Sequence, residues 1–162
     1  MRSTGEVMGI AADFPTAFAK AEIGAGTVLP SSGTVFISVR DEDKGPAAEV
    51  AARLVELGFA ILATHGTAAF LRARGIAVTG VNKVNEGRPH CVDAIINGDV
   101  AMVINTTSEG QAIRDSFSIR RTALTREVPY VTTVRAARAA AEAIASLRAH
   151  RLDVCSLQEY HQ

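Results

Sequence analysis

The 162 residues of the chain are enough for one domain of about 100–150 residues with an appendage, but not for two complete domains. Seventeen lysines and arginines balance seventeen aspartates and glutamates, which argues against a nucleic-acid or membrane partner held by bulk charge. The longest apolar run falls well short of the roughly 18 residues of a membrane helix, and the N-terminus lacks the layout of a signal peptide. We therefore expect a soluble, cytoplasmic protein.

The two cysteines, Cys91 and Cys155, are too few and too far apart in sequence for a disulfide framework or a zinc site. We expect both to act as small apolar side chains in a reducing compartment. The sequence gives no reason to expect a metal ion.

The first 33 residues do not follow the pattern of the rest of the chain. Residues 14–23 place apolar side chains on one face of a helix, and 24–33 form a linker that contains glycine, serine and proline. The segment 3–9 is expected to have no packing partner of its own. We expect this segment to be the end of a larger folded unit.

Residue 34 begins a first unit of strand and helix. Residues 34–39 are apolar and rich in β-forming side chains, which predicts a buried parallel strand, and the charged stretch 40–45 follows as a loop. Apolar side chains recur at helical spacing through 47–57, and Gly58 then ends the predicted helix.

The alternation of strand and helix continues to the C-terminus. We expect, in chain order, a strand at 59–63, a helix at 68–74, a strand at 76–81, a short helix near 91–97, a strand at 100–105, a helix at 111–126, a strand at 130–133 and a long helix at 134–149. Such alternation makes parallel strands with right-handed crossovers. The predicted fold is an open, doubly wound, parallel α/β sheet of five strands.

Polar side chains follow four of the predicted strands. In open α/β sheets, ligands bind outside the carboxyl ends of the strands, so these residues are expected along one rim. They are Lys44 after the first strand, Thr64 to Thr67 after the second, Asn82 and Lys83 after the third, and Asn105 to Ser108 after the fourth. A rim in contact with water is also rich in such residues, so each loop alone has a purely structural alternative.

The segment Ala63-Thr64-His65-Gly66-Thr67 is the most informative of these loops, because it joins a strand directly to a helix. The first N–H groups of a helix have no partner, a glycine lets a ligand approach, and threonine hydroxyls add hydrogen bonds. The pattern indicates an anion site, most plausibly for phosphate. The alternative is that Thr64 and Thr67 only cap the helix.

Seven motifs, taken together, resemble one known family. The first resembles the closing segment of the second ATP-grasp half of the carbamoyl-phosphate synthase large chain, and the others resemble that chain's C-terminal, methylglyoxal-synthase-like regulatory domain. They are Ser3-Thr4-Gly5-Glu6-Val7-Met8-Gly9, Ser38-Val39-Arg40, Ala63-Thr64-His65-Gly66-Thr67, Val81-Asn82-Lys83-Val84, Glu86-Gly87-Arg88-Pro89-His90, Ile104-Asn105-Thr106-Thr107 and Ile119-Arg120-Arg121. The resemblance implies a three-layer α/β sandwich at 34–162, preceded at 1–33 by the tail of an ATP-grasp synthetase domain and a linker.

The resemblance implies a regulatory role without catalysis by this fragment itself. Bacterial members bind UMP as an inhibitor and IMP as an activator at overlapping sites. The parent ligase makes carbamoyl phosphate from bicarbonate, glutamine-derived ammonia and two ATP, for pyrimidine and arginine biosynthesis. Its synthetase domains, which use ATP with Mg or Mn, and its glutaminase small subunit are the implied partners. No cofactor is implied for this domain, and self-association is left open.

The family's nucleotide-binding positions fall on specific residues of this chain. They are Lys44, Thr64, Gly66, Thr67, Lys83, Asn105, Thr106, Thr107, Asp115 and Ser116. The N–H groups and hydroxyls of the Thr64 to Thr67 turn would hold the 5′-phosphate, with counter-charge from Lys44 or Lys83. The Asn105 to Thr107 loop and the Asp115-Ser116 pair would then bind ribose and base.

Two features depart from the family pattern or limit what it implies. Glu109, Gly110 and Gln111 stand where many relatives carry basic residues, which removes positive charge near the proposed phosphate. Tyr130 and Thr132 match positions that contribute to ornithine binding in some members, but that site also needs carboxylates from the synthetase half. We therefore expect no tight ornithine binding by this fragment.

Two enzymes of related fold are the alternatives. Methylglyoxal synthase needs a carboxylate base beside dihydroxyacetone phosphate, and only Asp93 and His90 offer acid-base groups in the relevant loop. A helix-surface position for Asp93 and a helix cap for His90 explain these two residues better. The cyclohydrolase half of the bifunctional purine enzyme shares the strand-one Ser-Val, but the segment 3–9 points elsewhere. His65 could act as a base in the anion turn, but the simpler interpretation is a turn residue. The pair Arg120-Arg121 could contribute to a phosphate site, or it could lie on a helix surface or at an interface.

Overall fold

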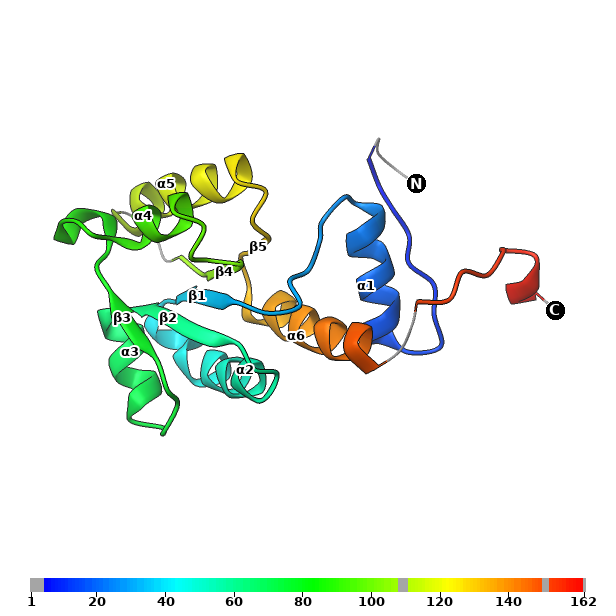
Figure 1. The fold of residues 1–162 in the computed structure, drawn as a ribbon, viewed down its shortest axis with the longest axis horizontal. Helices are drawn as coiled ribbons and strands as arrows, with labels where there is room; N and C mark the ends of the chain where they lie inside the picture. The colour runs from blue at the N-terminus through cyan, green and yellow to red at the C-terminus, as the bar shows by residue number, and fades with distance from the viewer. Residues whose placement is uncertain (1–4, 108–110, 150–151, 162) are drawn as a thin grey trace.

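A parallel sheet forms the centre of the structure, a computed structural model that describes residues 5–107, 111–149 and 152–161 (Figure 1). Its five strands lie in the order β3-β2-β1-β4-β5, and every neighbouring pair is parallel. They are β1 (Thr34–Ser38), β2 (Ala60–Thr64), β3 (Thr79–Val81), β4 (Met102–Asn105) and β5 (Tyr130–Val131). The predicted five-stranded α/β fold is confirmed.

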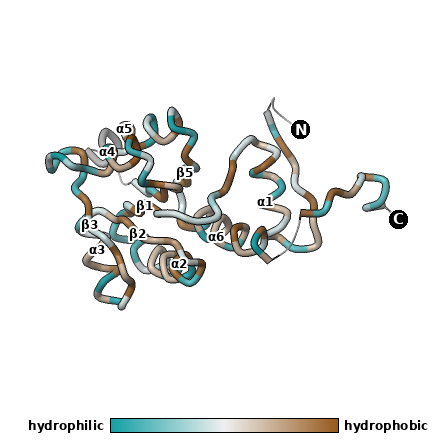
Figure 2. Tube along the Cα trace, viewed as in Figure 1, coloured by the Kyte–Doolittle hydropathy of each residue, from teal (hydrophilic) through white to brown (hydrophobic). Residues whose placement is uncertain are grey.

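Helices cover both faces of this sheet. In Figure 1, α2 (Lys44–Glu56), α3 (His65–Arg72) and α6 (Val134–Ala149) lie on one side, and α4 (Cys91–Ile96) and α5 (Gln111–Thr125) lie on the other. These helices carry both hydrophobic and hydrophilic residues along their length (Figure 2), as expected of elements with only one face against the sheet. The arrangement is a three-layer sandwich.

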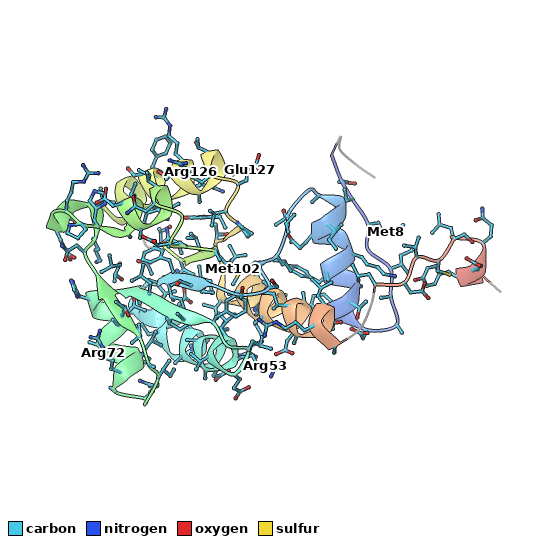
Figure 3. All side chains as sticks on the ribbon, viewed as in Figure 1. Met8, Arg53, Arg72, Met102, Arg126 and Glu127 are labelled. Atoms are coloured by element: carbon cyan, nitrogen blue, oxygen red, sulfur yellow. The ribbon has the colours of Figure 1, made fainter. Side chains whose placement is uncertain are left out.

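Alternate residues of each central strand enter two separate cores. Val35 and Ile37 of β1 pack under α2, α3 and α6, whereas Phe36 between them packs under α4 and α5. Strand β4 repeats the pattern with Met102 and Val103, and Figure 3 shows Met102 at the centre of the molecule. Because both faces are covered, these strands read as continuous apolar runs.

Several element boundaries differ from the sequence-based expectation. Helix α2 begins at Lys44 rather than at 47, because Pro46 is tolerated in a first turn whose N–H groups have no helical partner. Helix α3 begins at His65, directly after β2, rather than at 68. Strand β3 is limited to Thr79–Val81, since only these residues pair with β2. Both earlier helix starts bring predicted site residues onto helix N-termini.

Helix α1 (Phe14–Gly24) packs beside α6, away from the sheet (Figure 1). The side chain of Ala19 is buried, and the hydroxyls of Thr16 and Ser146 lie 2.7 Å apart. The expectation that segment 3–9 lacks a packing partner is wrong for its described part. A β-carbon on Gly9 would meet the carbonyl oxygen of Ala17 at 2.0 Å, so only glycine allows this approach to α1.

Candidate functional site

Predicted rim residues from all four loops converge on a cavity of about 320 Å³ at the carboxyl ends of β1, β2 and β4. Of the other predicted rim residues, His65 and Asn82 do not line it, and Ser108 lies outside the described residues. Every predicted nucleotide position except Asp115, whose side chain lies outside the described residues, contributes to its lining. The lining consists of Ser38, Val39, Arg40, Asp41, Lys44, Thr64, Gly66, Thr67, Lys83, Cys91, Asn105, Thr106, Thr107, Ser116 and Ile119.

The position of the cavity follows from the order of the strands. From β1 the chain proceeds to β2 and β3 on one side, and then returns to place β4 on the other side of β1. The loops that leave β1 and β4 therefore diverge and open a crevice between them. The register aligns Ser38 with Asn105 across this gap, so both residues lie at the same height on the rim.

The turn after β2 combines helix N–H groups with buried hydroxyls. Thr64 is the N-cap residue of α3, but its side chain makes no capping hydrogen bond. Its hydroxyl instead lies 3.4 Å from the hydroxyls of both Ser38 and Thr67. Both threonines are almost fully buried, at 3% and 2% exposed. The cluster thus faces the cavity, which does not fit the alternative in which the threonines only cap a helix.

Lys44 brings positive charge to this turn. As the first residue of α2, it places its ammonium group 3.7 Å from the point where a β-carbon on Gly66 would stand. Its Nζ also lies 2.7 Å from a carboxylate oxygen of Asp41. The hydrogen bond and charge of Lys44 hold the pKa of Asp41 below its ordinary value, so this carboxylate is ionised near neutral pH. Lys83 lines the same cavity from the loop after β3.

Three side chains at the end of β4 form a triangle of hydrogen bonds beside the cavity. The side-chain amide of Asn105 donates to the hydroxyls of Ser116 and Tyr130, each at 2.8 Å, and these two hydroxyls are 3.2 Å apart. Asn105 is only 4% exposed. The triangle fixes the orientation of the Asn105 amide and links α5 and β5 to the rim.

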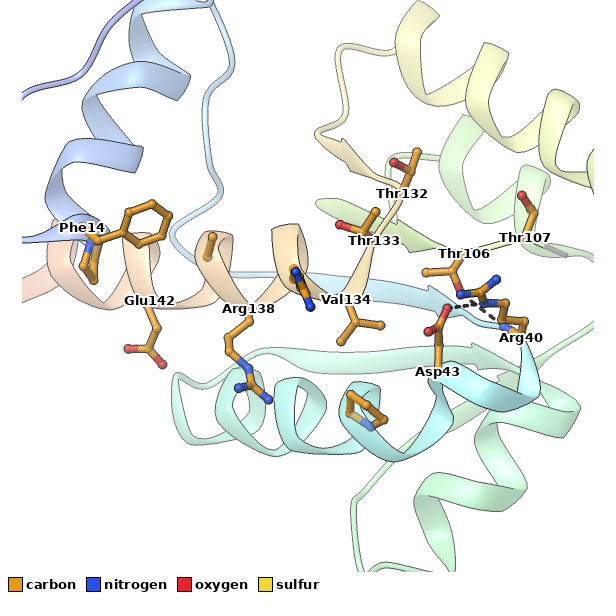
Figure 4. A pocket seen from close by; sticks show the side chains of 14 residues that line it. Phe14, Arg40, Asp43, Thr106, Thr107, Thr132, Thr133, Val134, Arg138 and Glu142 are labelled. Carbon is orange, nitrogen blue, oxygen red and sulfur yellow. Dashed lines mark hydrogen bonds and ion pairs between the residues drawn. The ribbon is translucent and has the colours of Figure 1, made fainter.

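The structure separates the two positions that the resemblance connects with ornithine. The Tyr130 hydroxyl belongs to the triangle with Asn105, whereas Thr132 lines a second and larger cavity of about 940 Å³ (Figure 4). Arg40, Thr106 and Thr107 line both cavities and so form a shared wall.

Arg40 of this shared wall forms an ion pair with Asp43, which lines the larger cavity, with the guanidinium Nε 2.8 Å from the carboxylate (Figure 4). Burial acts to raise the pKa of Asp43, but hydrogen bonds from Thr106 and Arg40 outweigh burial and leave the pKa below its ordinary value. The Arg40 N–H also donates to the Thr106 hydroxyl at 3.2 Å. The loops after β1 and β4 are therefore joined at this point.

Some lining residues were not predicted as site residues. Ser38 is the last residue of β1, and Val39, Arg40 and Asp41 follow it, so the rule that ligands bind at the carboxyl ends of strands could have included them. Cys91 and Ile119 enter from α4 and α5. Their positions could not be foreseen, since helical periodicity identifies a buried face but not the point where that face borders a cavity.

His65 and the arginine pair on α5 point elsewhere. The Nε2 of His65 lies 2.9 Å from the Asn82 side-chain oxygen, and the residue does not line the described cavity. Arg120 places its guanidinium 5.9 Å from the centre of the Tyr130 ring, and Arg121 is exposed. Their structural alternatives fit these positions better than a role in anion binding.

Asp93 and His90 form a closed structural unit at the start of α4. His90 is the N-cap, its Nδ1 accepts the Asp93 N–H, and the Asp93 carboxylate accepts the His90 N–H at 2.9 Å. An ion pair with Arg88 and the His90 N–H hold the pKa of Asp93 at about 2. Neither residue lines the described cavity. This arrangement does not supply the carboxylate base that methylglyoxal synthase requires.

Within the ranges that the structure describes, no group of three or more His, Cys, Asp or Glu side chains is placed to hold a metal ion. None of the described helices is both long and apolar enough to span a bilayer.

Comparisons with known proteins relate the chain to one family. The family model described as the MGS-like domain matches residues 47–132. The carbamoyl phosphate synthase large chain of Myxococcus xanthus (strain DK1622) is 52% identical over 160 residues, which cover 99% of this chain and 15% of the relative. The proteins of the same name from Brucella suis biovar 1 and Mesorhizobium japonicum are 53% and 55% identical, and each match covers 99% of this chain and 14% of the relative. The chain thus spans about one seventh of these relatives.

Proposed function

Because the chain belongs to the family of MGS-like domains, we propose that it is a regulatory nucleotide-binding domain, with UMP as inhibitor and IMP as activator of the enzyme that contains it. One observation carries the proposal. A buried threonine cluster, a helix N-terminus and Lys44 face the same cavity at the switch point of the sheet.

The 5′-phosphate would bind at the turn after β2. The free N–H groups of α3 near Gly66, the hydroxyls of Thr64 and Thr67, and the Lys44 ammonium supply its donors. A hydrogen bond to a charged group contributes about 1.5–3 kcal/mol, and a helix N-terminus adds about 0.3–1 kcal/mol. Three or four such contacts are sufficient for micromolar affinity after the cost of association.

Ribose and base would lie toward β4 and α5. The Asn105 amide is oriented by Ser116 and Tyr130, and the loop from Thr106 to Thr107 borders the same space. Asp115, which we also assign to this site, lies outside the described side chains. A cavity of about 320 Å³ suits one small ligand at a time. A purine and a pyrimidine nucleotide would therefore share one phosphate site and exclude each other.

We extend the proposal to the whole protein from the named relatives. Their common name supports a parent enzyme that synthesises carbamoyl phosphate. The family resemblance extends the proposal to bicarbonate, glutamine-derived ammonia and two ATP as its substrates, and to pyrimidine and arginine biosynthesis as its role. Its synthetase domains, with ATP and Mg or Mn, and a glutaminase small subunit would be the partners in the cytoplasm. The fragment has no catalytic role of its own in this proposal. Ligand binding would bias the synthetase domains through different affinity for two enzyme states.

Calorimetric titration of the chain with UMP and IMP tests the binding step. We expect heat with both, and we expect saturation with one to abolish heat from the other. Absence of heat with either at millimolar concentration would refute the proposal. Production of methylglyoxal from dihydroxyacetone phosphate would replace it with the lyase function.

A further inference from the structure

Asp41 stands at the place in the cavity where an anion is expected. Its carboxylate lies 2.7 Å from the Lys44 ammonium, and both residues line the cavity. Lys83 is close enough to act on the Asp41 carboxylate by charge alone. The negative group therefore lies in the field of both lysines that the site offers to a phosphate.

Resting on the nucleotide-binding function above, we propose that Asp41 is an internal competitor of the ligand phosphate for Lys44 and so sets an upper limit on nucleotide affinity. In the empty site, Asp41 neutralises the Lys44 ammonium. When a nucleotide binds, its phosphate takes over Lys44, and the Asp41 carboxylate turns outward.

The exposure of the two side chains supports this exchange. The side chain of Lys44 is 18% exposed, whereas that of Asp41 is 93% exposed. The lysine is thus held by its surroundings at the cavity, while the aspartate is free to rotate into water. An exposed pair of this kind contributes little energy, so a phosphate dianion with further donors from the turn can displace it.

The neighbouring acidic residues have different roles. Asp41, Glu42 and Asp43 form the short helix η1 (Asp41–Asp43), but Glu42 lies 3.7 Å from the Arg40 guanidinium and is not among the residues that line the described cavity. Asp43 also pairs with Arg40 and faces the second cavity. Of these three carboxylates, only Asp41 reaches Lys44.

The test compares Asp41→Asn with a matched control, Glu42→Gln, which removes the same charge one residue further along the chain. UMP, IMP and inorganic phosphate are titrated into the wild type and both variants, with uridine as a ligand that lacks phosphate. We expect Asp41→Asn to bind all three phosphate ligands about two- to fivefold more tightly than the wild type. We expect uridine binding to be unchanged, and Glu42→Gln to behave like the wild type.

The outcomes separate this inference from the proposed function. If Asp41→Asn binds the phosphate ligands no more tightly than the wild type, the inference is overturned. It is also overturned if Glu42→Gln gains as much affinity for these ligands as Asp41→Asn, because the gain would then be a general effect of charge. If one of these two results is found and the wild type still binds UMP and IMP, the competition by Asp41 is refuted and the nucleotide-binding function stands. If neither nucleotide binds but Asp41→Asn gains affinity for inorganic phosphate, the nucleotide function fails and the competition stands.

Discussion

The hydroxyls of Thr64 and Thr67 show how much of the site depends on single residues. Thr64 ends β2, and Thr67 lies in the first turn of α3. Both are buried, their hydroxyls are 3.4 Å apart, and the Thr67 hydroxyl also accepts the Val39 N–H at 3.4 Å. These two threonines therefore join β1, β2 and α3 at the point where the proposed phosphate binds. Buried hydroxyls that face a cavity at this distance can exchange one partner for a ligand oxygen.

Thr67→Ala tests this shared phosphate contact. If UMP and IMP use the same phosphate site, the variant loses about ten- to hundredfold in affinity for both, because a hydrogen bond to a charged group is removed. Calorimetric titration measures the loss. Thr67→Ser is the control, since it keeps the hydroxyl and should retain most of the affinity. Loss of only one nucleotide would contradict a common phosphate site.

The lowered pKa of Asp93 predicts that the stability of the folded protein depends on pH. Its pKa is about 2 in the folded protein against an ordinary value of 3.8, so its ionised form stabilises the fold above about pH 4. This contribution is lost as the pH falls from about 4 to 2. Asp93→Asn should therefore melt at a lower temperature than the wild type at pH 7, and the gap should close between pH 4 and pH 2. A gap that is constant over this range would contradict the role of the carboxylate charge.

At the scale of elements, two helix starts create the site. Helix α3 begins directly at the end of β2, and α2 begins at Lys44 because Pro46 fits its first turn. Each helix has a glycine as its second residue, Gly66 in α3 and Gly45 in α2. Of these two glycines, only Gly66 lines the cavity of about 320 Å³.

Gly66→Ala separates helix stability from ligand binding. The backbone of Gly66 does not require glycine, and the added β-carbon would meet the Lys44 ammonium at an ordinary 3.7 Å, so we expect no loss of stability. The methyl group would occupy the approach of the phosphate to the N–H groups of α3. We therefore expect at least a tenfold loss of UMP and IMP affinity, since one hydrogen bond to a charged group corresponds to about that factor.

Gly45→Ala is the matched control, because its β-carbon would meet no atom within 4 Å and the residue lies outside the cavity lining. Thermal melts and calorimetry of both variants check the expectation. Equal nucleotide affinity of Gly66→Ala and the wild type would show that the phosphate does not approach this turn.

At the scale of the whole molecule, helix α1 is an element attached to the outside of the α/β sandwich. It packs beside α6 beyond the end of the sheet, and its Ala19 side chain is buried, while the cavity of about 320 Å³ lies at the carboxyl ends of the strands. The larger cavity extends between these regions, from Phe14 of α1 to the wall of Arg40 and Thr106 (Figure 4). The segment before residue 34 thus contacts the α/β sandwich directly.

Ala19→Glu tests whether α1 is a separable attachment. A carboxylate does not fit this buried position, so we expect α1 to detach and the free energy of unfolding to fall by about 1–3 kcal/mol. Limited proteolysis should then cut within the first 33 residues, and UMP affinity should stay unchanged. Ile23→Glu, at a half-exposed position of the same helix, is the control. Loss of UMP binding in Ala19→Glu would show that α1 supports the cavity.

The sequence by itself determined the strands, the helices and the site loops of this protein. Apolar runs such as 35–37 and 102–104, with helices of mixed character between them, are local patterns that a parallel sheet requires. The same reasoning placed Lys44, the Thr64 to Thr67 turn and Asn105 on one rim, because parallel strands end at the same edge. Apolar character and its spacing are properties of neighbouring residues, so they can be read along the chain.

Only the tertiary structure decided which groups touch across that rim. The contact between Tyr130 and Asn105 depends on strand order and register. The ion pairs of Asp41 with Lys44 and of Asp93 with Arg88 depend on side-chain rotamers. The return of the chain from β3 to β4 beside β1 opens the cavity, and no local pattern specifies that neighbour. The physical reason is that the contact of Tyr130 with Asn105 joins residues far apart in sequence, which the packing of the sheet brings together. The two ion pairs depend on side-chain directions, which no pattern of residue types along the chain specifies.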